Sequence, residues 1–231
     1  MRLEKHITLR LGCSRKEARA LIRRGRVQVD GATIRRSAEP VDVDAAITVD
    51  GQPVVRPPDA VAFHKPPGVQ CTVGDPLGRR SLQEEVPELL RWKLHPVGRL
   101  DADSEGLLLL LRDGQCTQRL LHPKHGVRKV YDAEVEGQCP EGLREQLASG
   151  VTTALGVFQA ELLELEARAS GARVRLAVTE GKHRMVRRML ANLGLPVHRL
   201  VRREMGPVKL NDLAVGQWRP LSDAELGALP R

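Results

Sequence analysis

Aromatic residues are scarce in this chain of 231 residues, which contains two Trp, two Phe and one Tyr. The core must therefore be built from Leu, Val, Ile and Ala side chains. Long apolar runs are also missing, since none comes near the roughly 18 residues that a membrane helix needs, and we expect no membrane association. The N-terminal MRLEKHITLRLG has scattered charges and lacks the apolar stretch of a secretory signal, which predicts a cytoplasmic protein.

Cysteine clusters are absent as well. The four cysteines lie apart and without Cys-x-x-Cys spacing, at positions 13, 71, 116 and 139. We interpret them as reduced thiols of a cytosolic protein. His122 and His125 stand close together in HPKH, but two histidines without a third ligand are more typical of a surface. The sequence shows neither a metal-ligand group nor a glycine-rich phosphate loop, so we predict no metal and no cofactor.

Positive charge is concentrated at the start of the chain. The formal net charge is +8, and residues 1–36 alone contain 11 Lys and Arg residues against three acids. The rest of the chain carries 26 charges of each sign. A basic module on a neutral body indicates an anionic partner, most often a nucleic acid; a solubilising basic face is the alternative.

The first 55 residues predict a small module of two helices plus a hairpin. Apolar residues recur at steps of four over residues 3–11, which predicts a helix, and Ser14 is a suitable N-cap for a second helix over RKEARALIRRG. RVQVDGATI alternates apolar and polar residues about an Asp-Gly pair, the pattern of a β-hairpin, and ITVDGQPV contains a second such turn. The two prolines of RPPDA stiffen the chain, so we expect a linker over about residues 50–60.

The stretch LGCSRKEARALIRRGRVQVDG resembles the S4 RNA-binding module of ribosomal proteins and RNA-modifying enzymes. The resemblance covers about the first 45 residues and implies an S4 domain over residues 1–55, whose second helix and hairpin bind RNA. The residues expected to contact RNA there are Arg15, Lys16, Arg19, Arg23, Arg24 and Arg26.

Residues 61–231 alternate short strand-like and helix-like segments. GLLLLLRDG predicts a fully buried strand, VRKVYDAEVEG and ARVRLAVTEG predict further strands, and AVAFHKPPGVQCTV predicts two strands joined by a Pro-Pro-Gly turn. QCTQRLLHP, PEGLREQLASG and HRMVRRMLANLG indicate helices. This irregular mixture favours the α+β class, with a largely antiparallel mixed sheet flanked by helices.

The segment GRLDADSEGLLLLLRDG places three acidic residues directly before the buried leucine run. Asp101 lies where the loop enters the core, and a carboxylate there is costly unless a cation or hydrogen-bond donors accompany it. The pattern alone is equally compatible with Asp101, Asp103 and Ser104 as turn residues that bond the backbone.

The same segment resembles the Gly-Arg-Leu-Asp signature of RNA pseudouridine synthases, and further motifs follow the order of that family. FHKPPGV resembles its Lys-Pro-x-Gly motif, RKVYDAEVEG its Lys-x-Tyr strand and TEGKHRMVRRML its basic helix. With the S4 module, the resemblance spans nearly the whole chain and is closest to the enzymes that modify bacterial ribosomal RNA. It implies a pseudouridine synthase catalytic domain over residues 61–231.

Carried over motif by motif, the resemblance implies three catalytic residues: Asp101 as the reactive aspartate, Tyr131 as the ring that stacks on the target uracil, and Arg187 as the partner of the aspartate. A nucleophilic or C1′-deprotonating carboxylate must be ionised yet dehydrated, and a buried guanidinium favours both. The tyrosine would be a flat apolar platform for an extruded base. A core position for Tyr131 and a phosphate contact for Arg187 are the alternatives.

The implied reaction breaks the N1–C1′ bond of a uridine, rotates the freed uracil and joins C5 to C1′, which requires neither cofactor nor metal. A second group of RNA-binding residues is expected in the body: Arg99, Lys182, Arg184 and Arg188. The implied partner is ribosomal RNA or a ribosomal-subunit assembly intermediate, bound by a monomer.

Two questions stay open at the level of sequence. WKLHPVGRLD resembles enzymes of the small subunit, whereas CTVGDPLGRRSLQEEVP resembles those of the large subunit; we favour the 16S RNA of the small subunit, with 23S RNA as the alternative. A non-catalytic RNA-binding factor for ribosome assembly would explain the charges equally well, but not the joint presence of Asp101, Tyr131 and Arg187.

Overall fold

The computed structural model describes residues 1–168 and 170–230. Its contacts divide the chain into two units, which we describe separately. The first comprises Met1–Asp59 together with Val86–Leu94, a segment that contains helix α4 (Pro87–Arg91). The second comprises Ala60–Glu85 and the chain from His95 onward. None of the helices in the described part of the chain is both long and apolar enough to cross a membrane.

The first unit contains the predicted pair of helices and both predicted Asp-Gly turns. Helix α1 (Leu3–Leu11) ends at Gly12, and Ser14 caps α2 (Arg15–Arg23) in a capping box with Glu17. Asp30-Gly31 and Asp50-Gly51 have positive φ angles, which suit two-residue hairpin loops. The strands form a sheet in the order β2 (Ala32–Thr33), β1 (Val27–Val29), β3 (Ile47–Val49) and β4 (Gln52–Pro53).

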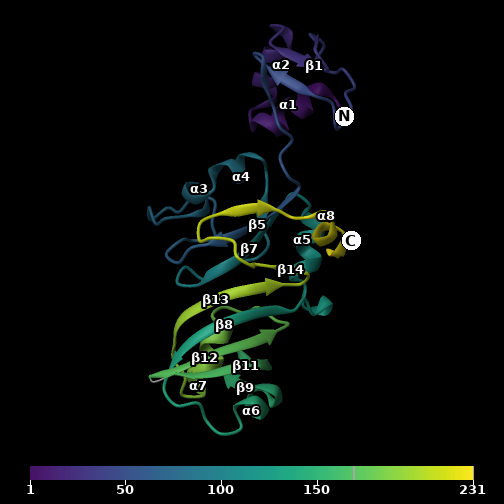
Figure 1. The fold of residues 1–231 in the computed structure, drawn as a ribbon. Helices are drawn as coiled ribbons and strands as arrows, with labels where there is room; N and C mark the ends of the chain where they lie inside the picture. Colours follow the sequence, from purple (N-terminus) through teal and green to yellow (C-terminus); the bar gives the residue numbers. More distant parts are fainter. Residues whose placement is uncertain (169, 231) are drawn as a thin grey trace. The chain divides into compact units, whose positions relative to one another are not determined.

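The second unit is built on one mixed sheet that runs through its centre (Figure 1). In sheet order its strands are β11 (Glu161–Arg168), β12 (Gly171–Val178), β8 (Lys129–Glu136), β13 (Val197–Met205), β7 (Glu105–Leu111), β5 (Ala60–Lys65) and β15 (Trp218–Pro220). Two short strands extend it, β14 (Val208–Lys209) on β13 and β6 (His95–Pro96) on β7. Among the described strands of this sheet only β13 and β7 pair in parallel, which confirms the expected α+β class and largely antiparallel sheet.

Helices and a small hairpin flank this sheet (Figure 1). They are α3 (Leu82–Glu85), α5 (Gly114–Leu121), the 3-10 turn Pro123–His125, α6 (Leu143–Ser149), α7 (Met185–Asn192) and α8 (Asp223–Ala228), with the hairpin β9 (Val151–Thr153) and β10 (Gly156–Phe158). Helix α7 packs against β13 and β9. The helix expected over PEGLREQLASG begins only at Leu143, and the strand expected after the Pro-Pro-Gly turn is reduced to a single bridge between Gln70 and Ser81.

The leucine run forms the buried strand that the sequence predicts. Every residue of β7 is buried, and Leu107, Leu109 and Leu111 join a cluster that includes Leu120 of α5 and Val201 of β13. Because both faces of the strand are covered, its backbone has little freedom, and the loop that precedes it is held at one end by a rigid element.

An ionic group lies on β8 at the residue next to Tyr131. Since successive side chains of a strand point to opposite faces, Asp132 faces away from the side that carries Tyr131. Its carboxylate accepts hydrogen bonds at 2.7–2.8 Å from Arg173, Arg175 and Arg203 on the neighbouring strands. Burial alone would raise the pKa of Asp132, but the three guanidinium groups outweigh it and hold that pKa well below its usual range.

We expect Asp132→Asn to lower the free energy of unfolding at pH 7 by about 3 kcal/mol, because three guanidinium groups lose their anion. The folded pKa of Asp132 lies below the unfolded value of about 3.9, so its stabilisation is present above that pH and is lost as the pH falls towards the folded pKa. The difference between wild type and variant should therefore shrink between pH 5 and pH 2. Urea unfolding followed by circular dichroism measures it, with exposed Asp212→Asn as control; a pH-independent difference would contradict the linkage.

Candidate active site

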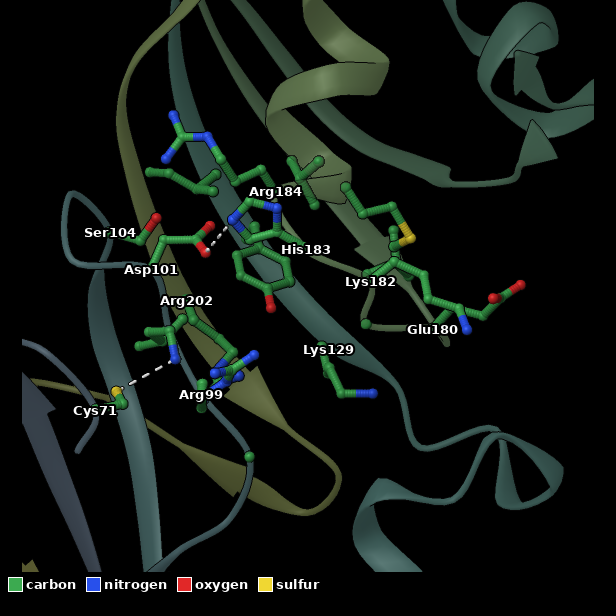
Figure 2. Close-up of a pocket in the computed structure, with 18 of the residues that line it drawn as sticks. Cys71, Arg99, Asp101, Ser104, Lys129, Glu180, Lys182, His183, Arg184 and Arg202 are labelled. Carbon is green, nitrogen blue, oxygen red and sulfur yellow. Dashed lines mark hydrogen bonds and ion pairs between the residues drawn. The ribbon is translucent and has the colours of Figure 1, made fainter. Parts of the chain in front are cut away.

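A pocket of about 600 Å³ opens in the second unit, between the loop before β7 and the loop before α7 (Figure 2). It is lined by residues 70–72, 97–102 and 178–186, by Ser104, Leu121 and Pro123, and by the pocket-facing side chains of β8 and β13. Cationic side chains outnumber acidic ones along its walls. The cations are Arg99, Lys129, Lys182, Arg184 and Arg202, and the acids are Asp101 and Glu180. The pocket therefore favours an anionic ligand.

Asp101 lies in this pocket on the loop between β6 and β7. Leu100 is buried beside it, and its N–H donates to the sulfur of Cys71 at 3.3 Å. On the other side the Ser104 N–H donates to the carbonyl of Asp101 at 3.0 Å, which closes a turn. Among the described residues, the side chain within ion-pair distance of the carboxylate is that of His183, whose Nε2 lies 4.0 Å from Oδ1. The loop is thus fixed through its backbone while the carboxylate remains available to a ligand.

Lys65 holds the loop of Asp101 through backbone carbonyls, a role that the sequence did not reveal. It is fully buried, and its Nζ donates to the carbonyls of Pro66 and Val69 at 2.8 Å and of Ala102 at 3.5 Å. The Gly68 N–H also donates to Ala102, at 2.7 Å. Burial lowers the pKa of Lys65. The lysine of the FHKPPGV motif is therefore a tie between the Pro-Pro-Gly turn and the loop of Asp101.

Tyr131 reaches the pocket from the middle of β8, about 30 residues further along the chain. Its neighbours across the sheet are Leu176 on β12 and Arg202 on β13, so all three side chains share one face. Tyr131 is only 9% exposed. Asp101 and Tyr131, both expected in the site from the sequence, thus line the same pocket.

Arg187 lies on α7 and contacts Asp103, whereas the resemblance implied a contact with Asp101. Its Nη2 donates to the carbonyl of Asp103 at 2.9 Å, its Nε lies 3.5 Å from the Asp103 carboxylate, and its Nη1 donates to the carbonyl of Val197 at 2.7 Å. Burial lowers the pKa of Arg187. Arg184 binds the same carboxylate at 2.9 Å. Asp103, expected only as a turn residue, therefore joins the loop of Asp101 to α7.

The residues expected to bind RNA fall into separate groups. In the body, Arg99, Lys182 and Arg184 line the pocket, whereas Arg188 does not. Six others lie in the first unit, four of them on α2 and two, Arg24 and Arg26, between α2 and β1. Two of those six pair with acids, Arg19 with Glu4 and Arg26 with Asp50. The exposed ones without such a pair are Arg15, Lys16, Arg23 and Arg24.

Two further cations of the pocket were not among the expected site residues. Lys129 is buried, its Nζ donates to the carbonyls of Val127 and Thr179 at 3.1 and 3.3 Å, and burial lowers its pKa. Arg202 is buried as well, and its Nε donates to the carbonyl of Leu107 at 2.7 Å. The sequence could have predicted Lys129 as a site residue. It stands two residues before Tyr131, and side chains two residues apart on a strand lie on the same face. Within the described residues, no three His, Cys, Asp or Glu side chains are grouped as a metal site.

Comparison with known proteins gives matches over both units. Residues 59–192 match the family of RNA pseudouridylate synthases, and residues 1–47 match the S4 domain. An uncharacterized RNA pseudouridine synthase of Mycobacterium tuberculosis is 39% identical over 99% of this chain and 92% of its own. The ribosomal small subunit pseudouridine synthase A of Escherichia coli is 35% identical, over 99% of this chain and 100% of its own. A crystal structure of a pseudouridylate synthase superposes with a TM-score of 0.67 at 29% identity, covering 100% of both chains.

Proposed function

The chain belongs to the RNA pseudouridylate synthase family and carries an S4 domain, and we propose that it converts uridine to pseudouridine in the 16S RNA of the small ribosomal subunit. The observation that carries this proposal is the meeting of Asp101 and Tyr131 in one cationic pocket. The small-subunit target is supported by the similarity over the whole chain to a ribosomal small subunit enzyme. The 23S RNA of the large subunit is the second candidate.

In the proposed reaction the target uridine leaves its helix and its uracil stacks on Tyr131. Asp101 then acts on the ribose, either by attacking it or by removing a proton from it. The N1–C1′ bond breaks, the uracil turns, and C5 joins C1′. The C5 proton is released and N1 gains a proton, so substrate and product are isomers and no other reactant is needed.

Arg187 supports this chemistry through Asp103. The pair that it forms with Asp103 holds the loop of Asp101 against α7. For Arg187 to pair with Asp101 instead, the loop would have to move when RNA binds. We therefore assign Arg187 the role of positioning the reactive loop.

Two basic surfaces would hold the RNA. We assign residues 1–55 to an S4 domain that grips phosphates through Arg15, Lys16, Arg23 and Arg24, which are exposed, and through Arg19 and Arg26 when they exchange their acids for RNA. We propose a linker at about residues 50–60 and a catalytic domain over residues 61–231. Arg99, Lys182, Arg184 and Arg188 would bind phosphates near the target. The protein is proposed to work as a cytoplasmic monomer on ribosomal RNA or an assembly intermediate.

Tritium release tests the function directly, because pseudouridine formation expels the hydrogen from C5. The protein is incubated with RNA labelled with [5-³H]uridine, as 16S transcript, 23S transcript and early assembly intermediates of each subunit. We expect release of about one equivalent per 16S RNA, with no release from 23S RNA. Release from 23S RNA alone would make the large-subunit RNA the target. No release from any of the four substrates would favour the non-catalytic assembly factor.

A further inference from the structure

Arg202 is a buried cation of the pocket whose hydrogen bonding is incomplete. Its side chain is 3% exposed, yet its Nη2 has no hydrogen-bond acceptor. Its one hydrogen bond runs from Nε to the carbonyl of Leu107, a neutral group. Among the described residues no carboxylate lies within ion-pair distance of it, although Arg199 and Arg203, the other two arginines of β13, both bind acids.

An unpaired buried guanidinium costs stability. Removal of a charge from water is repaid only by a counter-ion or by a full set of hydrogen bonds, and Arg202 has neither. Lys129 lies close enough to be affected by the charge of Arg202, and this adds a like-charge repulsion. A sequence that retains such a group in its pocket has a use for it there, and the missing partner is an acceptor that arrives with the substrate.

Burial decides which part of an RNA can be that acceptor. Arg99 and Lys182 are exposed, so they are open to the phosphates of an RNA that lies outside the pocket. Arg202 lies inside, and only a group that enters the pocket can reach it. Its position across the sheet from Tyr131, on the same face, places the guanidinium beside the ring on which we propose the uracil stacks.

We propose that the Arg202 guanidinium binds a carbonyl oxygen of the target uracil and stabilises the negative charge that develops on the base as the N1–C1′ bond breaks. This assignment rests on the proposed function. The electron pair of the broken bond stays with N1 and is shared with O2 and O4 of the uracil, whichever way Asp101 acts on the ribose. A preorganised cation at one of these oxygens stabilises the base most when the negative charge is greatest.

The test compares two leaving groups. Uridine and 5-fluorouridine are placed at the target position of the 16S substrate, and the loss of each nucleoside is followed in single turnovers by nuclease digestion and mass spectrometry. Fluorine withdraws electrons and stabilises the departing base, so the fluorinated substrate depends less on the guanidinium. Arg202→Met should slow the loss of uridine at saturating RNA by about 10²-fold and that of 5-fluorouridine by about tenfold, with KM nearly unchanged. Arg202→Lys should recover part of the rate.

Arg203→Met is the matched control, since it lies one residue further on β13 and its side chain binds Asp132, away from the pocket. It should react within about twofold of wild type. Thermal unfolding of Arg202→Met should match or exceed that of wild type, because an unpaired charge is removed. Equal losses on both substrates, or a loss confined to KM, would overturn the assignment while leaving the proposed function intact. An inactive wild-type protein would overturn both.

Discussion

Asp101→Asn is expected to abolish tritium release, with a loss of at least about 10⁴-fold at saturating RNA. The amide has the shape of the carboxylate but can neither attack the ribose nor take a proton from it. The fold should survive, because the loop is held by backbone contacts of Leu100, Ala102 and Ser104. Within the described part of the chain, the Asp101 carboxylate has only His183 near it, at 4.0 Å. Circular dichroism and thermal unfolding are expected to match wild type.

Asp103→Asn is the matched comparison, two residues away in the same loop. It removes the carboxylate that binds Arg184 and Arg187, but the backbone carbonyl that accepts from Arg187 at 2.9 Å remains. We expect a loss of about tenfold, since positioning is weakened and the reactive group is retained. If the two variants lost the same activity, or if Asp103→Asn were the inactive one, the reactive carboxylate would have to be reassigned.

Local patterns predicted much of the fold because their causes are local. The Asp-Gly pairs place positive φ angles where hairpins need them, and Ser14 with Glu17 forms the cap of α2. The leucine run could form only a strand covered on both faces. Strand β11 was not predicted. It lies at the edge of the sheet and is largely exposed, and its four charged residues give it the composition of a loop.

The candidate site was predictable only as far as its motifs. Asp101 and Tyr131 were expected together from a resemblance, and the pocket contains both. The partner of Arg187 could not be predicted in this way. Asp101 and Asp103 are two positions apart in one loop, and the sequence does not tell which of them contacts the arginine. Lys65 and Arg202 are recognisable only from burial and from cross-strand register, neither of which follows from the spacing of residues along the chain.

The register between β7 and β13 gives the second large prediction. These strands join the half of the sheet that carries Tyr131 and Arg202 to the half that follows Asp101, and their pairing consists of Val201 with Glu105 and Arg202 with Gly106. Gly106 has a φ of +107°, and a Cβ added there would lie 2.4 Å from the carbonyl oxygen and 2.6 Å from the nitrogen of Arg202. Both atoms are backbone, so the clash can be relieved only by parting the strands.

We therefore expect Gly106→Ala to lower the free energy of unfolding by more than about 4 kcal/mol, and to remove activity even where the protein stays folded. Urea unfolding and tritium release at 15 °C measure the two effects separately. Gly114→Ala is the control, since nothing lies within 4 Å of its added Cβ and it begins helix α5, where alanine should stabilise by up to about 1 kcal/mol. A folded, active Gly106→Ala would mean that the two halves of the sheet can separate without cost. Joint loss of stability and activity would instead tie catalysis to this one strand pairing, because it sets the distance from Asp101 to the ring and guanidinium across the pocket.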